Sequence, residues 1–390
     1  MRREPEALRL CTLLYSSFMS CDLSRRGLLQ GAGVAAWASA AMSGAPAQAQ
    51  ANSRGGVPRI CLEISGGLSA AGLDEAGMRR IKQLGVNDVL MGGPPIPWEE
   101  SALRALMDRL KAGGLTLGNL MISGFPNAIY GRPGRDEEID KVRQSIRAAG
   151  RAGLPVVEYN FYAHRVVEGY YEETGRAGAG LTAFDYSRVK DLPPLPAEGV
   201  HALDEMWSNA AYFLKAVVPV AEEAGVRLAL HPNDPPAPES RGSGQIMGTV
   251  EGWKRLVDIM PSPSNGITFD CGVTREMGQD PVEVCRYFGG RDCINHVHYR
   301  NVRVRVPYQK YTEVFLDEGE IDMFAVMREL VRQKYPRLVY PEHPRALDAD
   351  RERPGFHPYY PGGGSYVGYA YNVGYARAML QAALTLSGPQ

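Results

Sequence analysis

Two histidines and two acidic residues stand at or beside the ends of short apolar runs in the second half of the chain. The runs RLALH, GITFD, INHVHY and RLVYPE supply His231, Asp270, His298 and Glu342. Each residue alone has a simpler explanation: a strand-end histidine usually bonds a loop carbonyl, Asp270 could cap a turn, and Glu342 could pair with Arg345. Ligand-type side chains at four successive run ends favour a shared metal site instead.

These runs are the last of eight that alternate with helix-like segments after Pro58. We expect strands at residues 59–65, 88–93, 116–122, 155–161, 227–231, 266–270, 294–299 and 337–342. Apolar spacing near 3.6 predicts helices at residues 73–85, 98–114, 136–153, 203–225, 249–260, 280–290, 322–335 and 368–386. Apolar runs that alternate with helices imply a parallel sheet. The sequence therefore predicts an α/β fold, a (β/α)8 TIM barrel. An open doubly wound sheet is the less favoured alternative, because no G-x-G-x-x-G follows the first strand.

A barrel of this kind would bring the four residues together. Its chemistry lies at the carboxyl ends of the strands, where the βα loops begin. Neighbouring strands are about 4.8 Å apart, so the four side chains can converge on one ion. Two neutral imidazoles and two carboxylates suit Mn²⁺, Mg²⁺, Fe²⁺ or Zn²⁺ better than a soft metal.

The segment NHVHYRN offers further candidates. His296 and His298 share one face of a strand by its two-residue repeat. We expect His298, nearer the mouth, to be the ligand and His296 to lie deeper. Arg300 and Asn301 follow and are expected to bind substrate, because a guanidinium can grip a carboxylate with two hydrogen bonds. A surface salt bridge is the alternative for Arg300.

Several motifs together resemble those of the mannonate dehydratase family. They are VVEYNFYAHRVVEGYY, GLTAFD, HPNDPP, HVHYRN, DEGEIDMFAVM and PEHP, and they span about Leu115 to Glu342. The resemblance implies a xylose-isomerase-like barrel, a divalent cation and a sugar-acid substrate. The expected reaction is the dehydration of D-mannonate or a related aldonate to a 2-keto-3-deoxy acid.

The resemblance implies the same four metal ligands, with departures. Asp270 stands where the family has a cysteine, and Cys271 follows it. A shift of one residue reverses a strand side chain, so Cys271 cannot take its place. Glu342 stands where the family has an aspartate, and Asn233 replaces an aspartate in HPNDPP. The loss of a thiolate makes the site harder, so we expect Mn²⁺, with Mg²⁺ or Fe²⁺ as alternatives.

The resemblance also implies proton-transfer and substrate-binding groups. His343 resembles the family's catalytic histidine. Tyr359 and Tyr360, in GFHPYYPGGGSY, fall where the family has a catalytic loop tyrosine, and simple packing is their alternative. Asn160 and Arg165 are expected to contact substrate hydroxyls or its carboxylate.

Two other functions fit the same pattern. A sugar isomerase or epimerase on this barrel would use two glutamates, an aspartate and a histidine around the metal. His231 occupies one of those glutamate positions, which removes a base and favours the lyase. A non-catalytic, exported sugar-acid-binding protein is the second alternative, and His343 beside the metal argues against it.

The N-terminal segment differs from the rest. LSRRGLLQGAGVAAWASAAMSGAPAQAQAN has paired arginines, Arg25 and Arg26, then an Ala/Gly run and small-residue cleavage sites. This order is typical of a secretory signal of the twin-arginine type. We therefore expect residues 1–51 to be an N-terminal extension and signal peptide, with translation starting at Met1 or Met19. The predicted mature protein is a single TIM-barrel domain, residues 52–390, delivered to the periplasm or beyond by the twin-arginine machinery.

Composition excludes several partners. The formal net charge of −1 gives no sign of binding to nucleic acid or, in the mature form, to a membrane. A small-molecule sugar acid remains as the expected partner, and a homo-oligomer is left open. No cysteines have C-x-x-C spacing. After cleavage the cysteines expected to remain as buried thiols are Cys61, Cys271, Cys285 and Cys293.

Overall fold

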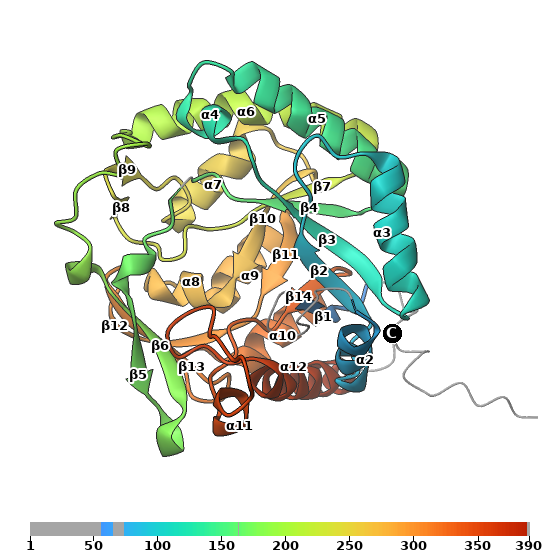
Figure 1. The fold of residues 1–390 in the computed structure, drawn as a ribbon, viewed down its shortest axis with the longest axis vertical. Coiled ribbons are helices and arrows are strands. Elements are labelled where there is room, and N and C mark those ends of the chain that lie inside the picture. Colours follow the sequence, from blue (N-terminus) through green and yellow to red (C-terminus); the bar gives the residue numbers. More distant parts are fainter. Residues whose placement is uncertain (1–55, 65–73, 163, 388–390) are drawn as a thin grey trace, which may run out of the picture. The chain divides into compact units, whose positions relative to one another are not determined.

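Eight parallel strands close into a barrel in the computed structural model, which describes residues 56–64, 74–162 and 164–387 (Figure 1). Their order around the barrel is β1-β14-β11-β10-β7-β4-β3-β2. Their bounds are β1 Arg59–Glu63, β2 Asp88–Gly92, β3 Thr116–Ile122, β4 Val156–Tyr159, β7 Arg227–Leu230, β10 Asn265–Asp270, β11 Ile294–His298 and β14 Leu338–Tyr340. All neighbours pair in parallel. The predicted (β/α)8 fold is therefore confirmed, and the predicted signal segment lies outside the described residues.

Helices surround the barrel (Figure 1). The longer ones are α2 Glu75–Gln83, α3 Glu100–Ala112, α5 Arg135–Ala152, α6 Leu203–Ala224, α7 Val250–Ile259, α9 Pro281–Gly289, α10 Met323–Arg332 and α12 Tyr366–Leu386. Short helical segments are α4 Pro126–Tyr130, α8 Cys271–Glu276, α11 Asp348–Arg351, η2 Val167–Gly169, η3 Arg176–Gly178 and η4 Tyr186–Arg188. Gly153 and Gly225 end α5 and α6 in the left-handed region, with φ of 86° and 67°. Only glycine adopts this conformation without strain, which is why these helices stop where the sequence predicted.

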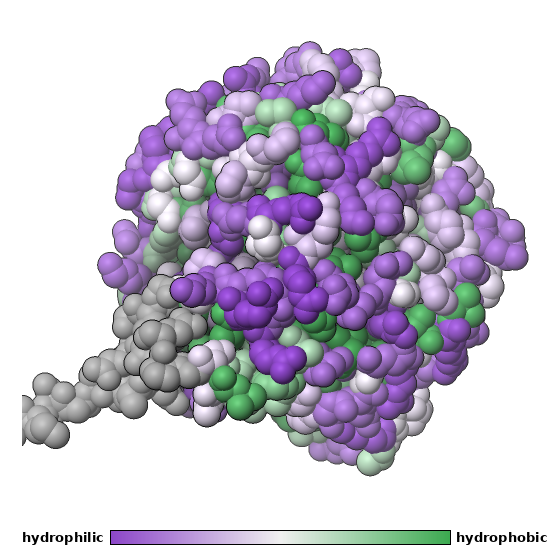
Figure 2. Space-filling model, turned by 180° about the vertical axis from the view of Figure 1, so that it is seen from behind, coloured by the Kyte–Doolittle hydropathy of each residue, from purple (hydrophilic) through white to green (hydrophobic). Residues whose placement is uncertain are grey.

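Most of the buried side chains of the barrel domain are apolar, as the strand sequences require, although Glu158 and His296 are buried among them. Val157, Ala229, Phe269 and Val297 have no exposed surface. Hydrophilic side chains cover most of the described surface seen in Figure 2, with hydrophobic ones scattered between them. No helix among the described residues is long and apolar enough to cross a membrane. The cysteines at 61, 271, 285 and 293 are buried and free, which confirms the prediction of buried thiols.

A second, antiparallel sheet lies beside the barrel, and the sequence patterns did not predict it. Its strands, in the order β12-β13-β6-β5, are β5 Tyr170–Thr174, β6 Gly180–Asp185, β12 Asn301–Val306 and β13 Lys310–Val314. One hairpin follows β4 and the other follows β11, and β13 joins them by pairing with β6. A small pair, β8 Glu239–Ser240 with β9 Ser243–Gly244, follows β7. The second sheet matters for the site because it supplies Glu313 from β13.

Candidate active site

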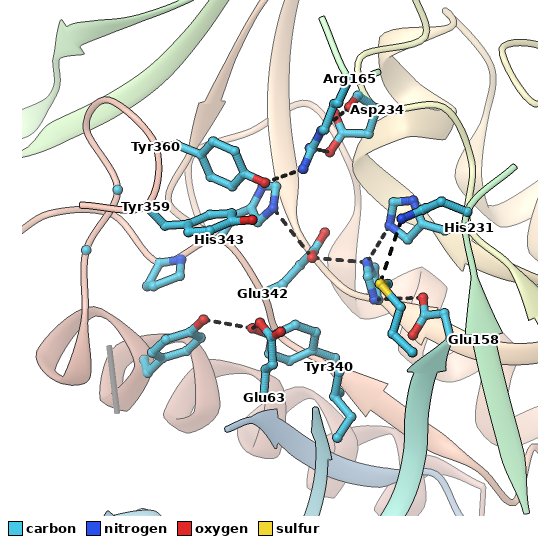
Figure 3. A pocket seen from close by; sticks show the side chains of 18 of the residues that line it. Glu63, Glu158, Arg165, His231, Asp234, Tyr340, Glu342, His343, Tyr359 and Tyr360 are labelled. Atoms are coloured by element: carbon cyan, nitrogen blue, oxygen red, sulfur yellow. Dashed lines mark hydrogen bonds and ion pairs between the residues drawn. The ribbon is translucent and has the colours of Figure 1, made fainter. Parts of the chain in front are cut away.

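A cavity of about 410 Å³ opens at the carboxyl ends of the barrel strands (Figure 3). Eight of the predicted site residues line it: Asn160, Arg165, His231, His298, Glu342, His343, Tyr359 and Tyr360. Side chains from β4, β7, β11 and the segment after β14 therefore meet in one place, as the barrel prediction required. Asp270, Arg300 and Asn301 do not line the cavity.

The four candidate metal ligands converge beside this cavity. Nε2 of His231 lies 3.1 Å from Nδ1 of His298. The same Nδ1 atom lies 3.0 Å from Oε2 of Glu342 and 3.8 Å from Oδ2 of Asp270. His231, Asp270 and His298 offer ligand atoms within 4.8 Å of one another. One nitrogen or oxygen from each of four strand ends is thus available to a single cation.

His231 has the tautomer that a metal-binding histidine needs. Its Nδ1 lies 2.7 Å from the carbonyl oxygen of Pro232, which can accept a hydrogen bond only from an Nδ1–H group. The Nε2 lone pair then faces His298 and the cavity. Burial, reinforced by His298, lowers the pKa of His231 to about 3. A neutral imidazole with a fixed lone pair is the form that binds metals.

Asp270 and Glu342 each present one oxygen to the cluster. Oδ1 of Asp270 accepts the backbone N–H of Val273 at 2.8 Å and caps helix α8, so only Oδ2 faces His298. Oε2 of Glu342 faces His298, while Oε1 lies 3.1 Å from Nε of Arg300. Asp270 therefore caps a helix, much as its simpler explanation held, and its second oxygen, which also accepts a hydrogen bond from Arg300, has a lone pair left to bind a cation.

Arg300 does not lie where the sequence predicted. Its side chain is about 2% exposed, and its Nε lies 3.1 Å from both Asp270 Oδ2 and Glu342 Oε1. Its Nη1 lies 2.6 Å from Oε1 of Glu276. Asp234, at 3.4 Å, and Glu313, at 3.6 Å, complete a shell of five carboxylates. Arg300 is a buried counter-ion behind the candidate ligands and does not reach a substrate in the cavity.

Asn301 is also a structural residue. Its Nδ2 donates to the carbonyl oxygens of Leu316 and Ile321, and its Oδ1 accepts the N–H of Ile321. The amide is fully used in holding the β12 end against the loop after β13, and the residue is about 2% exposed. The expectation of substrate contact is not met, because the side chain turns into the protein and away from the cavity.

The HPNDPP segment divides its two polar residues between different tasks. Asn233 is buried, and its Oδ1 accepts the N–H of Met247 at 2.8 Å. Asp234 is also buried and accepts hydrogen bonds from Arg165 and from the hydroxyl of Tyr170, the latter at 2.9 Å. Asn233 thus ties the loop to its own chain, while Asp234 positions a guanidinium that lines the cavity.

The donor set and its charges fit a divalent cation. Burial would raise the pKa of Asp270, but Arg300 and His298 outweigh that effect and hold the pKa below its ordinary value. Burial raises the pKa of Glu342 to about 8, although His343 opposes the shift. The cost of burying this carboxylate is what a bound cation would offset. Nitrogen and carboxylate donors in equal number match Mn²⁺, Mg²⁺, Fe²⁺ or Zn²⁺.

Glu158 is a residue of the site that sequence reasoning missed. It lies within β4, is fully buried and lines the cavity (Figure 3). Its Oε1 lies 3.6 Å from Nε2 of His298, on the side of that ring away from the ligand cluster. Thr268 and Asn119 donate hydrogen bonds to its two oxygens at 2.7 Å. The acidic residue inside the apolar run VVEY was the signal that could have indicated a functional role, because burying a carboxylate without a partner costs free energy.

His296 lies in the barrel interior below His298, as predicted. It is fully buried, and burial lowers its pKa well below the ordinary value. The rings of His296 and His298 stand 5.0 Å apart, nearly perpendicular. The alternation of side chains along β11 therefore gave the correct relative depth of the two histidines.

His343 is paired with a buried carboxylate. Its Nδ1 lies 2.9 Å from Oε2 of Glu313, and its Nε2 lies 3.5 Å from Oε2 of Glu342. Arg345 also donates to Glu313 at 2.9 Å. Burial would raise the pKa of Glu313, but His343, Arg345 and Arg300 lower it to about 2. An ionised Glu313 fixes the proton on Nδ1 and leaves Nε2 at the cavity to exchange protons.

The two predicted tyrosines differ in placement. Tyr359 is 87% exposed at the cavity mouth. Tyr360 stands 5.2 Å from the His343 ring, and its hydroxyl accepts a hydrogen bond from Nη1 of Arg165 (Figure 3). Burial raises the pKa of Tyr360, against the effect of Arg165, so the phenol is protonated. Tyr360 is the better placed of the two for proton transfer.

The predicted substrate-binding residues after β4 both reach the cavity. Arg165 bonds Asp234 and Tyr360, which holds its guanidinium in place. Asn160 has a buried Oδ1 with no hydrogen-bond partner among the described residues. That oxygen can accept a bond from a ligand hydroxyl.

The comparisons with known proteins agree with this geometry. A family model described as D-mannonate dehydratase (UxuA) matches residues 198–384. A mannonate dehydratase of Thermotoga petrophila is 29% identical over 326 residues, which cover 73% of this chain and 89% of that protein. A mannonate dehydratase of Streptococcus pneumoniae is 31% identical over 252 residues, covering 58% of this chain and 69% of that protein.

A solved structure extends the likeness to the fold. The crystal structure of mannonate dehydratase from Streptococcus suis serotype 2 superposes with a TM-score of 0.74 and 26% sequence identity. The match covers 86% of this chain and 96% of that one. Sequence and fold lead to one assignment: the chain belongs to the mannonate dehydratase family.

Proposed function

We propose that this protein is a metal-dependent hydro-lyase that removes water from a sugar acid, D-mannonate or a related aldonate, and forms a 2-keto-3-deoxy acid. The observation that carries the proposal is the position of His343. Its Nε2, 3.5 Å from Glu342, borders both the candidate ligands and the cavity, and its Nδ1 is bonded to Glu313. Relatives with the dehydratase name over most of their length support the same activity.

His343 is suited to be the general base. Dehydration begins with loss of the proton on C2, next to the substrate carboxylate. Nε2 is the ring nitrogen of His343 that is not bonded to Glu313, and the residue lines the cavity. As that nitrogen takes the proton, the ring becomes cationic, and the Glu313 carboxylate bonded to Nδ1 stabilises the charge. The arrangement is the carboxylate–histidine pair that many enzymes use to activate an imidazole.

Tyr360 is suited to be the general acid. Loss of the C3 hydroxyl requires a proton, and the Tyr360 phenol is protonated and held beside His343. Arg165, bonded to the same oxygen, stabilises the phenolate that remains. The product enol then takes a proton at C3 and gives one up at O2, so the net change is the loss of one water.

His231, Asp270, His298 and Glu342 would hold the divalent cation. When bound there, the cation supplies Lewis-acid stabilisation of the negative charge that develops on the substrate carboxylate. We propose Mn²⁺ first, since the set contains no thiolate, with Mg²⁺ or Fe²⁺ as alternatives. Elemental analysis of the purified protein identifies the metal, and zinc as the sole bound metal would contradict this choice.

A substrate panel tests the function. The purified protein, loaded with Mn²⁺, is incubated with aldonates and uronates, and 2-keto-3-deoxy acids are assayed. We expect turnover of at least one aldonate by the wild type and none by His343→Asn, while both proteins retain their metal. If no acid gives product although the metal is bound, the lyase proposal is wrong and a binding protein is the better account.

An epimerase is the weaker alternative. Epimerisation by two carboxylate bases needs one glutamate or aspartate on each face of the substrate. His231 occupies one of the two positions where such a carboxylate is needed. Its Nδ1 is bonded to Pro232 and its Nε2 faces His298, so this ring is placed as a ligand. The geometry thus supports the lyase.

We also propose that the protein is exported in folded form. The paired Arg25 and Arg26, the Ala/Gly run after them and the small residues near Ala49 support a twin-arginine-type signal. Because folding and metal binding are coupled where a site forms only in the folded state, export after folding would allow metal loading inside the cell. Cell fractionation with N-terminal sequencing tests this: full-length protein confined to the cytoplasm would exclude it.

A further inference from the structure

Glu63 is an acidic residue of the cavity whose carboxyl group makes almost no hydrogen bonds within the described residues. It is the last residue of β1, and its side chain lines the cavity (Figure 3). Within the described residues its one hydrogen bond is a long one, 3.4 Å from the Tyr340 hydroxyl to Oε2. The Tyr340 hydroxyl is also 2.7 Å from that of Tyr369. The Glu63 carboxyl therefore has acceptor capacity left for a ligand.

The two arginine side chains that line the cavity lie elsewhere and are already bonded. Arg165 donates to Asp234 and Tyr360, and Figure 3 shows these residues on the opposite side of the cavity from Glu63. Arg345 lines the cavity too, but it is about 1% exposed and its donors reach Glu313 and the carbonyl of His343. Neither guanidinium is placed to neutralise a second anionic group near Glu63.

Glu63 and Asn160 therefore offer unused acceptors to the same ligand. Asn160 contributes a buried Oδ1 without a partner, and the carboxylate of Glu63 can accept from two hydroxyls at once. Hydrogen bonds from neutral donors to a buried charged acceptor are among the stronger ones in proteins. These acceptors in the cavity match a ligand with a polyhydroxyl chain.

We propose that Glu63 binds hydroxyl groups at the tail of the sugar acid, the end away from its carboxylate, and excludes a second negative charge there. The inference rests on the proposed function and adds to it a residue that sets specificity. An aldarate or a 6-phosphorylated sugar acid would place an anion against Glu63, and neither guanidinium of the cavity stands there to balance the charge. Unphosphorylated monocarboxylic acids meet no such repulsion.

The test compares the wild type with Glu63→Gln, which keeps the size of the side chain and removes its charge. The substrates are an aldonate, the aldarate of the same configuration and the 6-phosphoaldonate. We expect KM for the aldonate to rise about 10-fold in the variant with kcat little changed, since the proposed contact holds the tail of the substrate and not its reacting carbons. We expect the preference for the aldonate over the two acids with a second anionic group to fall by about the same factor.

Two controls make the result specific. Glu75→Gln, at an exposed position on α2, should leave every constant unchanged. Metal content is measured for each protein, so that a disturbed ligand cluster is not mistaken for a specificity effect. Unchanged KM and unchanged preference in Glu63→Gln, with full metal content, would overturn the inference.

The same experiment separates the two proposals. If the wild type dehydrates none of the acids, the proposed function fails. Glu63 is then judged by calorimetric binding of the same three acids to wild type and variant. Equal affinities of the two proteins for all three would overturn the role of Glu63, whereas weaker aldonate binding by the variant would support it.

Discussion

Nε2 of His231 and Nδ1 of His298, from two different barrel strands, face each other at 3.1 Å. Each ring has its other nitrogen turned toward an oxygen, the Pro232 carbonyl for His231 and the Glu158 carboxylate for His298. Two imidazole nitrogens that face each other beside carboxylate oxygens make the strongest structural case for a cation here.

Removing one of these ligands should abolish tight metal binding. We predict that His231→Ala lowers the affinity for Mn²⁺ by at least about 100-fold, because a ligand matters more than the residues that orient it. Isothermal titration calorimetry on metal-free protein measures this. His164→Asn is the matched control, since His164 lies outside the main cavity. Equal affinities in wild type and His231→Ala would exclude His231 as a ligand.

Glu158 should act on the metal through His298. Its carboxylate, 3.6 Å from Nε2, is placed to hold a proton on that nitrogen and leave Nδ1 free. Second-shell carboxylates of this kind typically contribute 10- to 100-fold to metal affinity. We predict a loss in the range of about 10- to 100-fold for Glu158→Gln, with the fold retained by circular dichroism. The nitrogen NMR shifts of His298 should report a change of tautomer, and an unaltered tautomer together with unaltered affinity would refute the role.

Catalysis and metal binding should separate at His343. We predict that His343→Asn lowers kcat by roughly 10²- to 10⁴-fold, the usual contribution of a positioned base. Its metal content should stay at the wild-type level, because this ring is not among the four candidate ligands. Glu313→Gln should show a smaller loss of kcat with a shifted pH profile, since it only positions His343. Wild-type kcat in His343→Asn would remove the residue from the mechanism.

Arg300 should be a stability residue. Its removal would leave five buried carboxylates without their shared counter-ion. We predict that Arg300→Met lowers the free energy of unfolding by about 3–5 kcal/mol, the usual cost of breaking a buried ion pair. Urea denaturation of metal-free protein measures it, with Arg303→Met, at an exposed position, as the control. A change below about 1 kcal/mol, the value typical of surface pairs, would contradict the counter-ion role.

Bound metal should stabilise the fold. A ligand that binds only the native state adds about 2.7 kcal/mol at 100 times its dissociation constant. We therefore predict that EDTA lowers the melting temperature and that Mn²⁺ restores it, whereas His231→Ala responds to neither. A melting temperature of the wild type that is indifferent to both reagents would count against metal binding in the folded state.

The barrel could be predicted because its strands are short apolar runs, buried on both faces and separated by helices that end at glycines such as Gly153 and Gly225. The antiparallel sheet beside the barrel could not. Its strands Tyr170–Thr174 and Lys310–Val314 are mixed in polarity, and the pairing of β13 with β6, which joins the two hairpins into one sheet, is between segments distant in sequence. Pairing of that kind depends on where the barrel places the loops.

Within the site, the positions of residues at strand ends were enough to predict the candidate ligands. They were not enough to predict which way the side chains beyond the strand ends point. His296, His298 and Arg300 follow one another at intervals of two residues. The rings of the two histidines are in contact, and His298 and Arg300 both face Asp270, so the alternation of β11 continues past the end of the strand. The sequence suggested that Arg300 extends into the loop, because nothing in it reveals the five carboxylates that hold the guanidinium. Glu63 and Glu158 were missed because each stands inside an apolar run that was interpreted as core, although an acidic residue in such a run is itself a signal of function.

The most direct test of the account is the proton NMR spectrum of the product formed from D-mannonate in D₂O by the manganese-loaded protein. The account predicts a 2-keto-3-deoxy acid, recognised by the new C3 signals and the absence of a C2 proton. Epimerised aldonate, with deuterium at C2 and its C3 hydroxyl retained, would contradict it.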